Sequence, residues 1–145
     1  ARSSSNYTLT VKTVSGTGVT IPAGSKQLVY SDGTNVVLGM RTKGYYTVPT
    51  TTYTAVKDDQ LLINTSSNDS GVGSPITITM PSSPSVGDEV TMIDSGNNLA
   101  SNNLTVSSSD NILGSSANLV VSTNGTSFTL VYVNATRGWI YKDNV

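Results

Sequence analysis

The residues best suited to ligand recognition form one short run, Arg-Thr-Lys-Gly-Tyr-Tyr, at positions 41–46. Its polar residues and glycine predict a hairpin turn with Arg41 and Lys43 at the tip. Tyr45 and Tyr46 would follow directly, on a strand. Aromatic faces and cationic donors are what sugar rings and acidic glycans need. These four residues are the candidate site for a glycan; the alternative is a charged turn beside tyrosines that pack in the core or at a subunit contact.

Groups that could do catalysis are few. The chain of 145 residues contains no histidine and no cysteine, which excludes Ser-His and Cys-His nucleophile pairs and Cys/His zinc sites. Carboxylate pairs of the kind that cleave glycosides occur at Asp58-Asp59 and Asp88-Glu89. Adjacent residues on a strand point to opposite faces, so neither pair converges on one substrate. We interpret them as solvated caps of strand ends and expect no catalytic residue, no enzymatic activity and no cofactor.

One segment loosely resembles a calcium-binding loop. Residues 64–71 place side-chain oxygens at alternate positions and end in a glycine. The segment offers a single carboxylate, Asp69, and lacks the terminal bidentate acid that such loops use. A polar surface loop without a metal is the preferred interpretation.

Charge and hydropathy narrow the range of partners. The chain has eight Lys and Arg residues against nine Asp and Glu, a formal net charge of −1. The cations are scattered, whereas nucleic-acid binders usually show a basic stripe, so nucleic acid is not expected as a partner. No apolar run approaches the length of a membrane span.

Short alternating runs predict an all-β fold. Ser, Thr and Asn dominate the polar residues and are poor helix formers, because their side chains compete for backbone hydrogen bonds. Apolar residues recur with period two in short stretches bounded by turn residues. The clearest runs are residues 7–12, 75–80, 88–94 and 127–133. This pattern is typical of an antiparallel β-sandwich or barrel-like module.

Turn signals separate these runs. Asp32-Gly33 and Asn124-Gly125 suit the positive φ of type I′ hairpin turns. Residues 41–44 are expected to close a further hairpin between the apolar run 36–40 and the strand that begins at Tyr45.

The run 127–133 has two apolar faces. Its even-numbered residues are Phe, Leu and Tyr, and its odd-numbered ones include two valines. A strand with two apolar faces is expected to be central in its sheet or to lie at a subunit contact. The residues predicted for that contact are Phe128, Leu130, Val131, Tyr132 and Val133.

Two halves of the chain resemble each other. The tripeptide Leu-Thr-Val occurs at 9–11 and 104–106, and Leu-Val-Tyr occurs at 28–30 and 130–132. The order of the motifs, the turn after each second motif and a closing apolar pair also agree, which predicts two related units. The apolar pair of the second unit begins with Trp139. That residue is expected to seal the core of the unit, with stacking on a saccharide as the alternative.

The repeat predicts two regions of unequal completeness. Residues 1–48 would be an N-terminal hairpin region that corresponds to the closing half of a unit, and residues 49–145 would be a complete β-sandwich module. A chain that begins with half a unit is expected to come from a longer protein of tandem modules. Alternatively, its N-terminal hairpin completes the sheet of a neighbour.

About two-thirds of the sequence resembles a module that recurs in structural proteins of tailed bacteriophages, notably the tail fibres and other virion appendages of marine cyanophages. The resemblance is carried by Tyr53, Ala55, Asp59, Thr77 to Pro81, Pro84, Gly87 to Asp94, Asn102 to Val106, and Leu130 to Trp139. It implies an all-β virion protein, commonly a homotrimer, and implies no catalytic residue.

Three functions follow as hypotheses. The first is a non-enzymatic, trimeric fibre or appendage protein on the surface of a tailed-phage virion, in contact with other virion proteins and involved in host attachment. The second is a capsid decoration or head-fibre protein that stabilises the shell. The third is a carbohydrate-binding β-sandwich that reads host glycans through residues 41–46.

Overall fold

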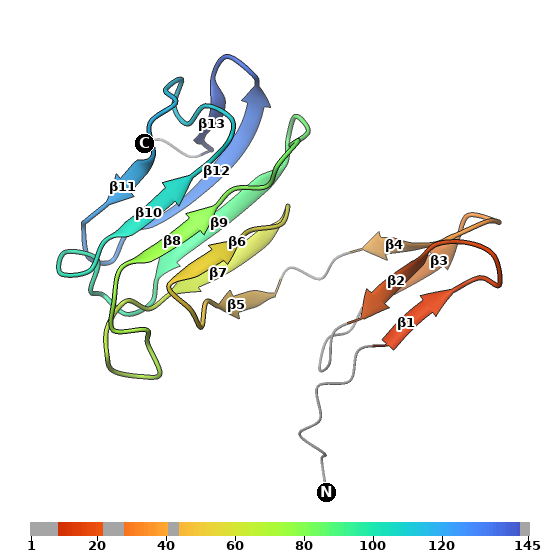
Figure 1. Ribbon diagram of the computed structural model, residues 1–145, viewed down its shortest axis with the longest axis horizontal. Helices are drawn as coiled ribbons and strands as arrows, with labels where there is room; N and C mark the ends of the chain where they lie inside the picture. Colours follow the sequence, from red (N-terminus) through yellow and green to blue (C-terminus); the bar gives the residue numbers. More distant parts are fainter. Residues whose placement is uncertain (1–8, 22–27, 41–43, 143–145) are drawn as a thin grey trace, which may run out of the picture. The chain divides into compact units, whose positions relative to one another are not determined.

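The computed structural model describes residues 9–21, 28–40 and 44–142, without the side chain of Met40. These residues form thirteen β-strands and no helix (Figure 1), so the predicted all-β class is confirmed. The chain divides into two compact units, Ala1–Thr42 and Lys43–Val145. The sequence placed this boundary after residue 48, and the difference assigns Tyr45 and Tyr46 to the C-terminal unit.

The N-terminal unit consists of two antiparallel hairpins. Its strands are β1 (Leu9–Lys12), β2 (Gly18–Ile21), β3 (Leu28–Ser31) and β4 (Val36–Met40). Strand β1 pairs with β2, and β3 pairs with β4. The predicted Asp-Gly hairpin turn is confirmed between β3 and β4, where Gly33 has a φ of 97°.

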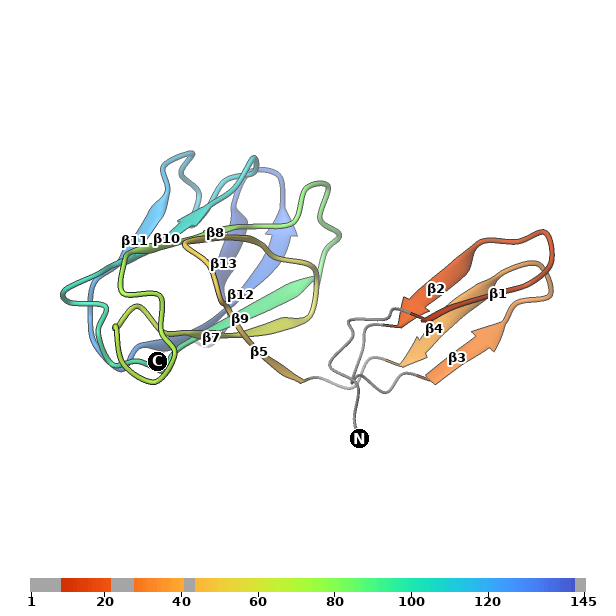
Figure 2. The same ribbon diagram turned by 60° about the horizontal axis from the view of Figure 1, so that its bottom comes forward.

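The C-terminal unit is a sandwich of two sheets. Its strands are β5 (Tyr45–Thr47), β6 (Thr52–Thr54), β7 (Asp59–Ile63), β8 (Ile76–Thr79), β9 (Glu89–Asp94), β10 (Leu104–Ser107), β11 (Leu119–Val121), β12 (Ser127–Asn134) and β13 (Gly138–Tyr141). One sheet has the order β11-β10-β8-β6, and the other has the order β13-β12-β9-β7-β5. Figure 2 shows the two layers. The predicted sandwich-like module is thereby confirmed.

The strands of this sandwich are paired differently from the expected antiparallel pattern. From β5 to β10 the chain crosses to the other sheet after each strand. The neighbours β5-β7 and β7-β9 in one sheet, and β6-β8 and β8-β10 in the other, are therefore parallel. Only the pairs β10-β11, β9-β12 and β12-β13 of this unit are antiparallel. Parallel neighbours need a crossover connection, and this one is supplied by a strand of the opposite sheet.

Neither of the other two predicted hairpins is among the described strand pairs. For the first, the turn residues 41–43 lie outside the described residues, and the strands that flank them belong to different units, where β4 pairs with β3 and β5 with β7. The Asn124-Gly125 turn exists, with a φ of 71° at Gly125, but it leads from β11 in one sheet to β12 in the other. A turn motif determines the local backbone conformation, but it does not determine which strand pairs with the strands on either side of the turn.

The hydrophobic core lies between the two sheets of the C-terminal unit. Alternate residues of the inner strands point into it, which produces the buried pattern of β7, β8, β9, β10 and β12. The largest fully buried side chains are Trp139, Leu61, Ile63, Ile76, Ile78, Met92, Leu99, Leu104 and Leu130. This unit therefore contains its own core.

Candidate functional site

The tyrosines of the predicted glycan site do not act together. They are adjacent on β5, an edge strand, and so point to opposite faces. The ring of Tyr46 packs against Tyr53 of β6, with 5.2 Å between centroids. Tyr45 is 63% exposed and Tyr46 is 45% exposed, so Tyr45 is the more accessible of the two rings. Their predicted cationic partners, Arg41 and Lys43, lie outside the described residues.

The carboxylates near strand ends hold local structure. Asp59 accepts hydrogen bonds from the hydroxyl of Tyr53 at 3.1 Å and from the backbone N–H of Val56 at 2.9 Å. Asp88 accepts one from the backbone N–H of Ser85 at 2.9 Å. Glu89 forms an ion pair with Lys142, with 2.8 Å between nitrogen and oxygen. These contacts fit the interpretation of the carboxylates as caps of turns and strand ends.

A shallow, open hollow lies where residues 54–57 meet the loop 81–85. Its volume is 410 Å³, and it is lined by those two segments and Asp88. The lining includes one cationic residue, Lys57. None of the described residues that line the hollow is aromatic, so it lacks the flat apolar surface on which a sugar ring would stack.

The loop that resembles a calcium site is organised by one buried asparagine. Oδ1 of Asn64 accepts hydrogen bonds from the backbone N–H and the hydroxyl of Ser66, at 3.1 and 2.7 Å. Its Nδ2 donates to the carbonyls of Asn68 and Asp69. Gly71 lies so close that a Cβ there would come within 2.4 Å of Oδ1 of Asn64. The oxygen in the first position of the loop therefore stabilises the backbone, and the described residues contain no cluster of three acidic or other metal-ligating side chains.

The strand predicted for a subunit contact is a central strand. Strand β12 lies between β13 and β9, which is one of the two places expected for it. Leu130 and Tyr132 face the core, and Phe128 packs at its margin. Val131 and Val133 lie half-buried on the outer face of the sheet. If β12 takes part in a subunit contact, it does so through these two valines.

Trp139 belongs to the core. Its side chain is 0% exposed, and its ring packs edge-on against Tyr132 with 5.6 Å between centroids. The predicted role in sealing the module is confirmed, and stacking on a saccharide is ruled out because no ligand could reach the ring.

Tyr132 links this core to the surface. Burial raises the pKa of its phenol above the ordinary value of 10.0. The carboxylate of Asp110 raises the pKa further, because it accepts a hydrogen bond from the neutral phenol and repels the phenolate. A raised folded-state pKa means that this stabilisation is complete below pH 10.0 and is lost as the pH rises through the folded-state pKa.

The stability of the wild type is therefore expected to fall above pH 10, and Tyr132→Phe should make that fall shallower. Urea unfolding at about pH 8 and about pH 11 would measure it, since the two pH values lie on either side of an ordinary tyrosine pKa. Tyr141→Phe, at a partly buried position on β13, is the matched control. An equal slope for wild type and Tyr132→Phe would contradict the assignment.

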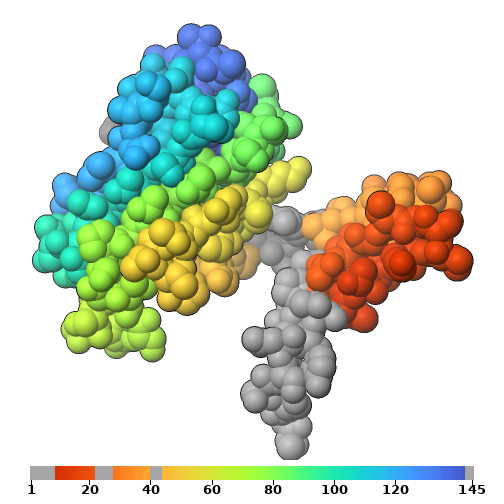
Figure 3. Space-filling model, in the orientation of Figure 1, coloured from red at the N-terminus to blue at the C-terminus, as the bar shows by residue number. Residues whose placement is uncertain are grey.

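Figure 3 shows the side of the C-terminal unit on which the four-stranded sheet lies. On β6, β8 and β10 the outer face of this sheet is polar and uncharged. The register places threonine or serine hydroxyls side by side on three parallel strands. These residues are Thr52, Thr54, Thr77, Thr79, Thr105 and Ser107. The hydroxyls of Thr79 and Ser107 are 3.2 Å apart, a hydrogen-bonding distance. Such a face is readily solvated.

The N-terminal unit leaves several apolar side chains uncovered. The register of β1 and β2 pairs Leu9 with Ile21 and Val11 with Val19, so that these four side chains share one face. None of the described side chains of this unit is buried. Leu9 and Leu28 are 61% and 62% exposed.

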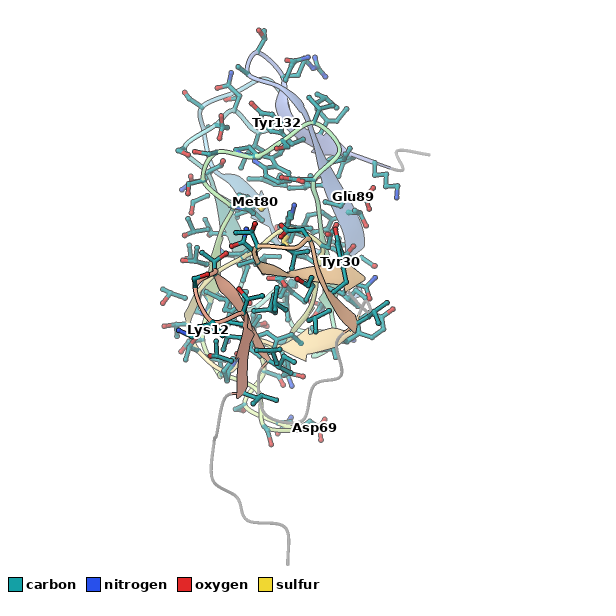
Figure 4. The ribbon with its side chains drawn as sticks, turned by 90° about the vertical axis from the view of Figure 1, so that its right-hand side faces the viewer. Lys12, Tyr30, Asp69, Met80, Glu89 and Tyr132 are labelled. Carbon is teal, nitrogen blue, oxygen red and sulfur yellow. The ribbon has the colours of Figure 1, made fainter. Side chains whose placement is uncertain are left out.

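Tyr30, labelled in Figure 4 on β3, is 57% exposed. The alternation of residues 9 and 11 predicts a strand with one apolar face. The sequence does not show that this face lacks a core to pack against.

The tip of the same unit is held firmly by polar groups. Oδ1 of Asp32 accepts the backbone N–H groups of Thr34 and Asn35 at 2.9 and 2.7 Å, and these bonds lower the pKa of its carboxyl. Oδ1 of Asn35 accepts the backbone N–H of Thr17 at 2.9 Å, across to the other hairpin. The two hairpins are thus joined at their turns, while their described apolar side chains are at most half-buried.

No protein-family model matches the sequence, and no curated protein matches it significantly. The likeness to tailed-phage proteins therefore stays a prediction from sequence motifs. Within the part of the chain that the structure describes, no helix is long and apolar enough to span a membrane.

Proposed function

We propose that the chain is a non-enzymatic structural component of a tailed-bacteriophage virion, and that it works as a homo-oligomer, a trimer, in a fibre or appendage used for host attachment. The observation that carries the oligomer is the N-terminal unit, in which no described side chain is buried and Leu9, Leu28 and Tyr30 remain more than half exposed. The sequence motifs given above support the assignment to a tailed-phage virion.

Hairpins of this kind need a partner. A two-stranded hairpin is marginally stable in water, and units below about 40 residues usually depend on disulfides, metals or oligomerisation. The chain contains no cysteine. Burial of apolar surface contributes about 25 cal/mol per Å², so covering the exposed leucines and Tyr30 with other copies would stabilise the unit.

The C-terminal unit suits the surface-exposed part of such a subunit. It buries its own core, and one outer face is a hydroxyl-rich surface that water can cover. A self-sufficient, solvated module joined to an apolar assembly element is an arrangement expected of a fibre or appendage subunit. Tyr45 is the exposed aromatic side chain through which contact with a host glycan would be tested first.

Light scattering coupled to size exclusion tests the oligomer. At micromolar concentration the full chain is expected to have about three times the 15.1 kDa mass of one copy. A stable mass of a single copy under these conditions would contradict the proposal.

The virion is tested separately. Antibodies against the C-terminal sandwich are expected to label the tail appendages of purified particles of the phage that encodes the chain, as seen by electron microscopy. Labelling of the shell would instead make it a capsid decoration protein. Particles that contain none of its peptides by mass spectrometry would rule out a virion component.

A further inference from the structure

The N-terminal unit repeats the last four strands of the C-terminal unit. In both, the first two strands form an antiparallel pair, with Leu9 opposite Ile21 in one and Leu104 opposite Val121 in the other. The next two strands form a second antiparallel pair in which Tyr30 lies opposite Val37, as Tyr132 lies opposite Trp139. Strands β1 to β4 thus correspond in order and pairing to β10 to β13.

The corresponding strands differ in what covers their other edge. In the C-terminal unit β8 pairs with the free edge of β10, and β9 pairs with that of β12. Leu104 and Leu130 are 1% and 0% exposed there. Their counterparts Leu9 and Leu28 are 61% and 62% exposed, and no described strand pairs with the corresponding edges of β1 and β3.

The open edges are β1 and β3 because the opposite side of the unit is already joined. Strands β2 and β4 are in contact. The backbone N–H of Val36, the first residue of β4, donates to the carbonyl of Thr17, just before β2, at 3.1 Å. An edge strand presents unpaired N–H and C=O groups, and proteins commonly guard such edges with charges or proline. Strand β3 carries neither.

We propose that β1 of one copy pairs edge to edge with β3 of a second copy. The proposal rests on the proposed trimer and specifies its contact. Around a three-fold axis a strand cannot pair with its own counterpart, so each contact must join two different edges. Each copy has one edge of each kind, and a closed ring leaves neither unpaired. The apolar faces that begin at Leu9 and Leu28 would then be covered by neighbouring sheets.

Cysteine cross-linking tests this pairing, since the chain has no cysteine of its own. Residues opposite each other on paired strands have Cα atoms about 4.5–5.5 Å apart, within the range that a disulfide bridges. Three single variants are made in the full chain: Thr10→Cys in β1, and Val29→Cys and Tyr30→Cys in β3. The Thr10 variant is unfolded and refolded together with each β3 variant and then oxidised; parallel samples receive a short bismaleimide, which tolerates a register offset.

One of the two mixtures is expected to give a covalent dimer on a non-reducing gel, and the other much less, because adjacent strand residues point to opposite faces. Thr10→Cys alone should give none. Thr79→Cys, on the exposed outer face of β8, is the control and should cross-link with no variant.

Each alternative outcome is distinct. A covalent dimer from Thr10→Cys alone would overturn the proposal in favour of β1 pairing with β1 across a two-fold axis. No cross-link in either mixture, with a trimeric mass retained, would overturn the edge pairing and leave the proposed oligomer standing. A monomeric mass of the wild-type chain would overturn both.

Discussion

Replacing Trp139 by alanine is expected to lower the free energy of unfolding of the C-terminal unit by about 3–5 kcal/mol. The side chain is completely buried and packs edge-on against Tyr132 across the β12-β13 pair. Its loss removes apolar burial and an aromatic contact, and leaves a cavity that the surrounding strands fill only in part.

Trp139→Phe is the matched control. Within the described residues the indole nitrogen of Trp139 has no hydrogen-bond partner, so phenylalanine removes volume without breaking a hydrogen bond. Its cost should therefore be clearly smaller than that of alanine. Urea unfolding followed by circular dichroism measures both variants, since neither retains the tryptophan as a fluorescent probe. A loss below about 0.5 kcal/mol for Trp139→Ala, the range of a tolerated surface change, would show that the ring does not seal the core.

The sequence located most strands but not their neighbours. The alternating runs at 75–80, 88–94 and 127–133 correspond to β8, β9 and β12 within a residue or two at each end. Alternation is a local property, so the sequence contains it. The parallel pairs β7-β9 and β8-β10 each join two strands that are separated along the chain by a strand of the other sheet. No turn motif encodes such a pairing.

The predicted glycan site shows that sequence adjacency does not predict which side chains lie together in space. Residues 45 and 46 were grouped because they are adjacent in sequence, yet adjacency on a strand sends their side chains to opposite faces. Trp139 was assigned correctly because its place in the repeated unit, after a turn and on the last strand, carried information about the fold. The composition of a short run was a poor predictor of a ligand site. The position of a residue within the repeated unit was a better predictor of its packing.

The exposure of the apolar residues in the N-terminal unit could be recognised only from the structure. Its strands have the same sequence pattern as β10 to β13, and the pattern alone predicts the same burial. What differs is the set of strands beside them, since β8 and β9 cover one copy of the pattern and no described strand covers the other. In the proposed oligomer, other copies would cover the apolar face that the single chain leaves unburied.

Val19→Asp is expected to dissociate the proposed oligomer into monomers while the C-terminal sandwich stays folded. Val19 lies on β2 opposite Val11, on the apolar face of the first hairpin, and is half-buried in a single chain. In an assembly that covers this face, each copy would contribute an unpaired carboxylate to an apolar interior, at an effective cost of several kcal/mol per charge. Light scattering should give a mass close to 15.1 kDa at concentrations where the wild type is oligomeric.

The neighbouring residue supplies the control, because Thr20 is exposed on the opposite, polar face of the same strand and lies across from Thr10. Thr20→Asp adds the same charge one residue away and should leave the mass unchanged. In both variants the urea unfolding of the C-terminal unit, followed by Trp139 fluorescence, should stay within about 0.5 kcal/mol of the wild type, as for surface changes away from its core. If Val19→Asp stays oligomeric, or if Thr20→Asp dissociates equally well, the apolar face of the hairpin is not what holds the copies together. The contact would then have to be sought on the outer face of β12, at Val131 and Val133.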